Sequence, residues 1–175
     1  IGEIRDEETA DIAIKFSLTG HLVFSTLHAN DAPSTVTRLI DIGIKPYLVG
    51  SSLSLVMAQR LVRKICPYCI ADYKPTEQEI MDAGLTEQDV REAKFKMGQG
   101  CVHCDNTGFS GRTGIFELLT VDKEIRQLIY DGGNQDLIRA SALSSGMRTL
   151  HDAAVSKMKR GLTTIREVIK MTIVE

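Results

Sequence analysis

The chain has 175 residues, of which 43% are apolar, so it can bury a sizeable core and lies between one and two ordinary domains in length. Its formal net charge of -2 gives no overall attraction to nucleic acid, and the sequence has no run of about 18 apolar residues that would predict a membrane span. It has no basic start leading into an apolar stretch, so we expect a cytoplasmic rather than a secreted segment, and Ile1 in place of an initiator Met indicates a fragment of a longer protein.

The first third of the chain alternates between helical and strand-like patterns. A helix is predicted over residues 6–20, where Asp6 can cap the first turn and a glycine ends the last. The apolar run of residues 21–28 contains β-forming side chains and predicts a buried parallel strand. A helix over residues 34–43 follows, and then a longer one over residues 46–63 that begins with proline. This alternation indicates an α/β fold.

Four cysteines in two Cys-x-x-Cys pairs give the strongest chemical signal, and the chain has no other cysteine: Cys66 with Cys69, and Cys101 with Cys104. A two-residue gap lets both sulfurs of a pair face one ion, and Zn²⁺ takes four thiolates tetrahedrally. A redox pair would usually need one such motif, and two disulfides are disfavoured in the cytosol. We therefore predict a structural zinc site that folds back the residues between the pairs.

Two histidines are considered as alternative ligands. His103 lies inside the second cysteine pair, so a site of three cysteines and one histidine is conceivable. His151 lies in the C-terminal part of the chain. We predict that neither histidine binds the metal.

The rest of the chain predicts short helices and one strand. Capping boxes at residues 76–79 and 86–89 indicate two short, polar helices between the cysteine pairs. Residues 115–119 read as a strand that returns to the core. From Asp122 onward three or four helices are expected to form a terminal bundle, the last opened by a capping box at residues 164–167.

Five motifs in a fixed order resemble those of the secretion ATPase superfamily. They are residues 1–10, residues 19–28, Ala58-Gln59-Arg60-Leu61, the two cysteine pairs, and Gly108-x-x-Gly111-Arg112-x-Gly114. The four cysteines point to the type II secretion and type IV pilus assembly (extension) ATPases, because the retraction branch typically lacks them. The loop Gly-x-x-x-x-Gly-Lys-[Ser/Thr], which would cradle phosphates, occurs nowhere in the chain, so we expect it upstream.

The resemblance implies the C-terminal part of a RecA-like P-loop ATPase domain with an inserted tetracysteine zinc module and a C-terminal helical bundle. It assigns residues 1–64 to the distal ATPase core, with its Walker B end and histidine box. Residues 65–107 would form the zinc-binding module, and residues 108–175 the return strand and bundle. This fold class is α/β.

The resemblance also implies the activity and the partners. The whole protein would be a cytoplasmic homo-hexamer that hydrolyses ATP with Mg²⁺, keeps Zn²⁺ as a structural ion and drives pseudopilus or pilus assembly. It would associate peripherally with the inner membrane through the platform protein and other components of the secretion or pilus machinery, without binding nucleic acid. The fragment alone would be inactive.

Glu3 is the candidate catalytic residue. A carboxylate just past the end of a buried strand lies at the edge of an α/β sheet where ligands bind, and it could orient or deprotonate the water that attacks a γ-phosphate. The alternative is a loop carboxylate that pairs with Arg5 or Arg38.

His21 and His28 resemble the family's histidine box and are the candidate nucleotide-binding residues. An imidazole can donate a hydrogen bond to a γ-phosphate oxygen. Seven residues apart on a strand, the two side chains face opposite sides, and we favour His28, at the carboxyl end of the strand, as the nearer to the nucleotide. The alternatives are that His28 caps the loop before Asp31 and that His21 is an exposed residue at the start of the strand.

Arg60 and Arg112 are further candidates for functional or structural roles. Arg60 could approach phosphates or a neighbouring subunit, or merely favour a helix C-terminus. Arg112 is expected to anchor the cysteine module to the core. The alternative function is a zinc-ribbon protein-interaction module without enzymatic activity.

Overall fold

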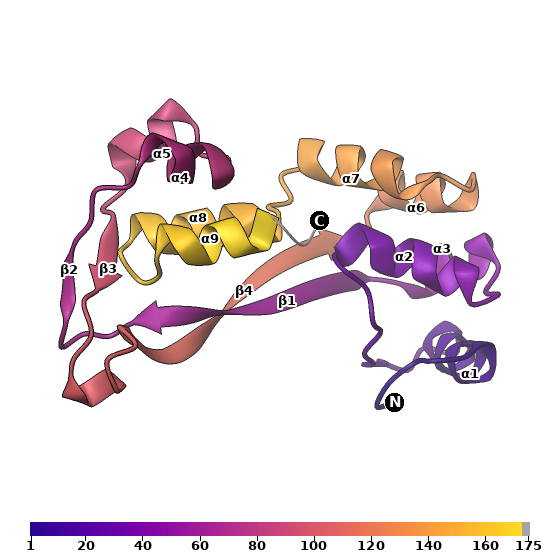
Figure 1. The fold of residues 1–175 in the computed structure, drawn as a ribbon. Helices are drawn as coiled ribbons and strands as arrows, with labels where there is room; N and C mark the ends of the chain where they lie inside the picture. Colours follow the sequence, from indigo (N-terminus) through magenta and orange to yellow (C-terminus); the bar gives the residue numbers. More distant parts are fainter. Residues whose placement is uncertain (173–175) are drawn as a thin grey trace. The chain divides into compact units, whose positions relative to one another are not determined.

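The computed structural model describes residues 1–172, which form two compact units (Figure 1). The first contains Ile1–Ala58 and Glu117–Met147, and the second contains Gln59–Phe116 and the chain from Arg148 onward. Strands β1 (Leu55–Ile65) and β4 (Phe109–Thr120) are hydrogen-bonded neighbours, and each contributes residues to both units. The functional division at residues 64 and 107 stays a prediction.

Five helices belong to the first unit: α1 (Glu7–Leu18), α2 (Ala32–Asp41), α3 (Pro46–Ser52), α6 (Lys123–Tyr130) and α7 (Gln135–Ser144). Helix α1 begins as predicted, because the Asp6 carboxylate accepts a hydrogen bond of 2.8 Å from the backbone N–H of Thr9. Apolar side chains from the helices and from both strands share one core, which includes Val36, Leu119 and Ile129. This core supports the α/β fold expected from the sequence.

Helix α2 begins two residues earlier than predicted. Asp31 is its N-cap, and the Asp31 carboxylate accepts from the Ser34 N–H at 2.8 Å while the Ser34 hydroxyl accepts from the Asp31 N–H at 3.1 Å. The buried Glu117 of β4 accepts a further bond of 2.8 Å from the Ala32 N–H. A carboxylate at a helix N-terminus satisfies backbone donors that the helix itself cannot, so β4 anchors the start of α2.

The predicted burial of residues 21–28 is wrong. Leu22 is 82% exposed and Phe24 is 76% exposed, and the segment is extended without a full strand ladder. The Ile1 nitrogen donates to the Phe24 carbonyl at 3.1 Å and the Ile4 N–H donates to the Thr26 carbonyl at 2.8 Å. The residue numbers increase in the same direction along both segments, so the two segments run parallel. Within the described residues, segment 21–28 has only this one neighbouring segment, which leaves its faces uncovered.

The helix predicted over residues 46–63 begins at Pro46 as expected, but its predicted extent is wrong. Helix α3 ends at Ser52, and Leu55–Ile65 forms strand β1. Val56 and Val62 are buried, whereas Met57 and Leu61 are exposed, which follows the period of two that a strand requires. The β-branched side chains favour a strand here because β4 lies alongside to accept and donate the ladder hydrogen bonds.

The second unit holds the excursion between the cysteine pairs and the last two helices: β2 (Ile70–Asp72), α4 (Glu77–Asp82), α5 (Glu87–Glu92), β3 (Lys96–Gly98), α8 (Leu150–Lys159) and α9 (Ile165–Thr172). Both predicted capping boxes are confirmed at the starts of α4 and α5. Helix α4 packs on α9 and α5 packs on α8, whereas α6 and α7 pack in the first unit. A single bundle of the four terminal helices is therefore not shown. Within residues 1–172, no helix combines the length and the apolar character needed to cross a bilayer.

Glu167 joins α9 to β1 instead of completing the predicted capping box. Its backbone N–H does donate to the Thr164 hydroxyl at 3.3 Å. Its carboxylate, only 7% exposed, accepts from the Arg63 backbone at 3.0 Å and from the Arg63 guanidinium at 2.8 Å. Arg63 also lies 3.9 Å over the ring of Phe109. Arg63 thus holds the base of the module, the role predicted for Arg112, whose exposed side chain has no hydrogen bond or ion pair with the described residues.

The charge of Glu167 should matter for stability. Burial by itself would raise the pKa of Glu167, but hydrogen bonds from Arg63, with Lys170 nearby, lower this pKa to about 2. We expect Glu167→Gln to reduce the free energy of unfolding by about 1–3 kcal/mol at neutral pH, because the buried donors of Arg63 lose a charged acceptor. Urea denaturation of the 175-residue chain measures this change.

The contribution of Glu167 to stability should depend on pH. A folded pKa below the ordinary 4.5 gives stability that is present above 4.5 and lost as the pH falls toward 2. The gap between the native chain and Glu167→Gln should therefore close over that window. Glu92→Gln removes a half-exposed partner of Lys159 and should cost less than about 1 kcal/mol. Equal losses in the two variants would contradict the role of Glu167.

Candidate functional site

Glu3 and His28 meet where two extended segments end together. Residues 1–4 run parallel to residues 24–26 through the two backbone hydrogen bonds described above, so Glu3 and His28 arrive at the same end. The His28 Nε2 atom lies 2.7 Å from the Glu3 Oε1 atom. The His28 side chain is 90% exposed and the Glu3 side chain is 24% exposed. A carboxylate and an accessible imidazole are thus presented side by side.

Arg5 is the second partner of Glu3. An Arg5 guanidinium nitrogen lies 2.6 Å from Glu3 Oε2, which confirms the pairing considered as the alternative for Glu3. This hydrogen bond, with a smaller contribution from His28, lowers the pKa of Glu3 below its ordinary value. Glu3 is therefore held ionised at neutral pH, as a group that orients a water molecule would need to be.

His21 lies at the other end of the extended segment. Its Nδ1 atom is 3.1 Å from the hydroxyl of Thr19, and its ring meets that of Phe16 edge-on at 5.5 Å between centroids. These partners hold His21 beside the C-terminal end of α1. The structure therefore brings His28, but not His21, into contact with Glu3, and the nucleotide-binding roles of both histidines stay predictions.

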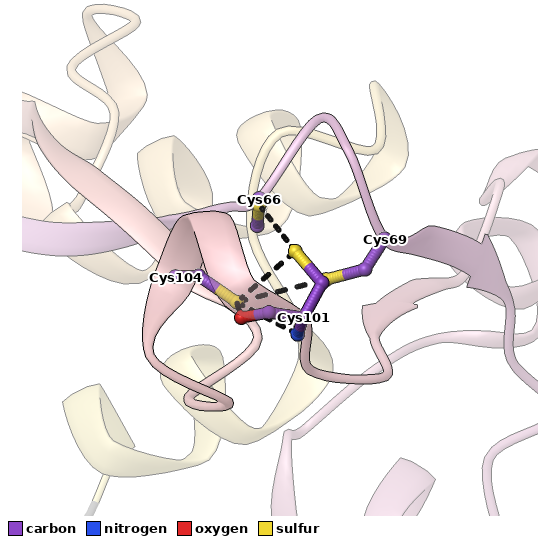
Figure 2. Close-up of side chains that lie close together, drawn as sticks. All are labelled: Cys66, Cys69, Cys101 and Cys104. Atoms are coloured by element: carbon purple, nitrogen blue, oxygen red, sulfur yellow. Dashed lines mark hydrogen bonds between the residues drawn. The ribbon is translucent and has the colours of Figure 1, made fainter.

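The four cysteine sulfurs gather around one point (Figure 2). All four lie within 4.8 Å of one another. The distances between neighbouring sulfurs are 3.9 Å for Cys66 and Cys101, 3.8 Å for Cys69 and Cys104, and 3.7 Å for Cys101 and Cys104. Tetrahedral zinc with Zn–S bonds of about 2.3 Å places its sulfurs about 3.8 Å apart. The predicted residues therefore fit a four-thiolate zinc ion.

Backbone donors favour the thiolate form of one of the four cysteines, Cys104. The N–H groups of Cys101 and Gly108 both donate to the Cys104 sulfur at 3.3 Å. Burial by itself would raise the pKa of the Cys104 thiol, but these hydrogen bonds lower it to about 6. A thiolate is the form that binds zinc, so the turn around Cys104 favours the metal-binding state.

Two glycines allow the cysteine loops to approach each other. Strand β2 pairs antiparallel with β3, in register from Ile70 with Gly98 to Asp72 with Lys96, so Cys69 and Cys101 lie beyond the same end of this short ladder. A Cβ atom at Gly98 would collide with the backbone of Gly108, and one at Gly108 would collide with Gly98. The two backbones can therefore lie in contact at the base of the module only without side chains.

His103 and His151 contact other groups, and the prediction that neither binds the metal stays a prediction. The His103 ring stacks on that of Tyr68 with the centroids 4.1 Å apart. The His151 Nε2 atom lies 2.7 Å from the carbonyl of Ala83, which ends α4. Within the described residues, the four cysteines form the one group of side chains that could hold a metal ion.

The motif order and this geometry agree with the comparisons with known proteins. Residues 1–170 match the sequence profile of a family described as "Type II/IV secretion system protein". The chain belongs to this family. The resemblance proposed from the five motifs is thereby confirmed.

Individual members of the family share about two fifths of their residues with this chain. The type II secretion system protein HxcR of Pseudomonas aeruginosa is 44% identical over 172 residues, which are 98% of this chain and 33% of that protein. The type IV pilus assembly ATPase PilB of Thermus thermophilus is 43% identical over 173 residues, which are 99% of this chain and 20% of that protein. The chain thus spans only about a fifth to a third of the length of these family members.

Solved structures confirm the fold. The ATPase DotB of Yersinia pseudotuberculosis matches with a TM-score of 0.66 at 19% identity, over 99% of this chain and 36% of that one. The pilus retraction motor PilT, solved with bound ADP, matches with a TM-score of 0.63 at 24% identity, over 97% of this chain and 38% of that one. The chain has an α/β fold similar to part of these ATPases.

Zinc binding by the four cysteines can be tested directly on this chain. We expect about one zinc ion per chain, and Cys104→Ser should abolish it, because three remaining thiolates hold the ion far less tightly. His103→Ala should keep the zinc, since His103 stacks on Tyr68 instead of joining the cluster. Elemental analysis after dialysis against a weak chelator measures both. Loss of zinc from His103→Ala with the native amount kept in Cys104→Ser would contradict the ligand set.

Proposed function

We propose that this chain is the C-terminal fragment of a cytoplasmic motor ATPase that powers type II secretion pseudopilus assembly or type IV pilus assembly. The observation that carries the proposal is the family match over residues 1–170, which includes relatives named as pilus assembly ATPases. The contact between Glu3 and His28 supports it, since the two residues that the resemblance assigns to water and phosphate lie together.

The fold supports a RecA-like ATPase core, of which this chain contains the two extended segments that carry Glu3 and His28. Segments 1–4 and 21–28 run parallel and end at the edge where Glu3 and His28 lie. Ligands of α/β sheets bind at the carboxyl ends of the strands. The exposed Leu22 and Phe24 are then covered by the rest of that sheet, which would come from the longer part of the protein together with the phosphate-binding loop.

Each residue of the site has a proposed role in phosphoryl transfer to water. The ionised Glu3 accepts a hydrogen bond from the attacking water and orients it. The exposed His28 can turn from Glu3 to donate to a phosphate oxygen, and His21 stays a proposed nucleotide contact. Bound ATP with Mg²⁺ supplies the γ-phosphoryl group and the charge that balances it. The zinc ion has a structural role at the base of the module.

The remaining roles follow from the family. The whole protein would act as a homo-hexamer at the cytoplasmic side of the inner membrane, where it would move the platform protein and contact other components of the secretion or pilus machinery. Nucleic acid is not a proposed partner. The alternative of a zinc-ribbon interaction module without activity stays a prediction as well, and ATP hydrolysis by the full-length protein separates the two functions.

The catalytic role of Glu3 predicts a separation of binding from turnover. In the full-length protein, Glu3→Gln should bind ATP with little change but hydrolyse it about 10²–10⁴-fold more slowly, the range typical of a lost acid–base group. Steady-state phosphate release and nucleotide binding by fluorescence measure the two quantities. Asp41→Asn, which alters an exposed carboxylate at the end of α2, should keep the native rate. Native turnover by Glu3→Gln would remove Glu3 from the mechanism.

The chain by itself should be inactive as an ATPase. It contains no Gly-x-x-x-x-Gly-Lys-[Ser/Thr] loop, so it has no backbone cradle or lysine for the β- and γ-phosphates. We expect no phosphate release above the buffer level from the purified, zinc-loaded chain. Turnover that disappears on Glu3→Gln would show that a complete site lies within these 175 residues.

A further inference from the structure

The two oxygens of the Glu3 carboxylate are in different environments. Oε2 lies 2.6 Å from the Arg5 guanidinium. Oε1 lies 2.7 Å from His28 Nε2, yet it is buried and accepts no hydrogen bond. It is the one buried side-chain atom of residues 1–172 in this condition. A buried acceptor without a donor is costly, so Oε1 is available to accept a hydrogen bond from a water molecule once the exposed His28 ring turns away from it.

We propose that Arg5 is a positioning residue that fixes one oxygen of the Glu3 carboxylate and thereby presents the other, Oε1, to the attacking water. The inference rests on the proposed function and adds to it the atom that receives the water. Nothing in the sequence pattern distinguishes the two oxygens, since a free carboxylate rotates between equivalent orientations. The guanidinium removes this equivalence.

The local backbone explains why Arg5 can take this role. Residues 1–5 are extended, and residues two apart in an extended chain face the same side, so the Arg5 side chain follows that of Glu3. Asp6 then caps α1, which fixes the position of Arg5 directly before the helix. A planar guanidinium with several donors holds a carboxylate oxygen in one geometry better than an ammonium does.

Exposure separates the role of Arg5 in catalysis from any role in folding. The Arg5 side chain is 75% exposed, so most of its charge is solvated. Ion pairs of such exposure contribute little to stability. Loss of Arg5 should therefore change how Glu3 works without changing how the protein unfolds.

Arg5 also sets the pH at which Glu3 is ionised. Its hydrogen bond lowers the pKa of Glu3, so removal of Arg5 should raise that pKa and move the acid limb of the rate profile to higher pH. Among the described residues, the charged or titratable groups that face Glu3 are Arg5 and His28. His28 is the same in every variant, so a shift of the acid limb reports on Arg5.

The experiment compares Arg5→Gln, Arg5→Lys and Lys15→Gln in the full-length protein. Arg5→Gln should lower kcat about tenfold with KM for ATP unchanged, less than the loss of Glu3 itself, because only the orientation is lost. Its acid limb should move to higher pH. Arg5→Lys keeps the charge and should restore the acid limb, though not the full kcat. Lys15→Gln breaks a similarly exposed pair with Asp11 and should behave as the native protein.

Several outcomes would overturn the inference and leave the proposed function intact. One is a native kcat in Arg5→Gln while Glu3→Gln is inactive. Another is a lowered kcat with an unmoved acid limb, which would mean that Arg5 does not act through Glu3. A third is a lowered thermal unfolding midpoint in Arg5→Gln that accounts for the lost activity. Native turnover by Glu3→Gln would instead overturn both the inference and the proposed role of Glu3.

Discussion

The pairing of β1 with β4 is the constraint on which the rest of the structure depends. Near the end of β1, the Cys66 N–H donates to the carbonyl of Gly108 at 3.0 Å, so the two cysteine loops start and finish beside each other. Further along β4, Glu117 reaches the first N–H of α2. One pair of strands thus places the metal ligands and anchors the helix that follows the candidate nucleotide site.

Signals confined to a few neighbouring residues could be predicted from the sequence. The cap at Asp6 and the boxes that open at Thr76 and Thr86 depend on side chains within three residues of the backbone they bind, so no distant partner can alter them. The strand over Leu55–Ile65 could not be predicted in this way, because its alternating pattern becomes decisive only when β4 supplies a ladder. The burial of residues 21–28 likewise depends on neighbours outside their own segment.

The candidate site shows the same limit. The sequence suggests that Glu3 and His28 each lie near a nucleotide, but only the parallel pairing of their two segments in the structure brings the side chains together. The choice of Oε2 by Arg5 depends on side-chain geometry that no spacing encodes. The Glu167 carboxylate has two possible sets of hydrogen-bond donors. A capping box would offer it one backbone N–H, whereas Arg63 offers a backbone N–H and a charged guanidinium. The carboxylate binds Arg63 because these donors are stronger and buried.

Two sets of interactions of unequal strength hold the segment between the cysteine pairs: the cysteine cluster and the ion pairs to α8 and α9. At its base, four thiolates can bind zinc with about 10–16 kcal/mol of apparent free energy, which is also folding free energy for the loops that carry them. At its helices, Lys159 pairs with Asp89 at 2.7 Å and Arg166 pairs with Glu79 at 3.1 Å. Arg166 is 61% exposed, so its pair contributes about 0–1 kcal/mol, and the less exposed pair of Lys159 and Asp89 contributes at most about 1.5–3 kcal/mol. These pairs orient α4 and α5 on α8 and α9 but are weaker than a bound metal ion would be. Helices α8 and α9 therefore belong structurally to the same unit as the excursion between the cysteine pairs, whereas α6 and α7 belong to the other unit.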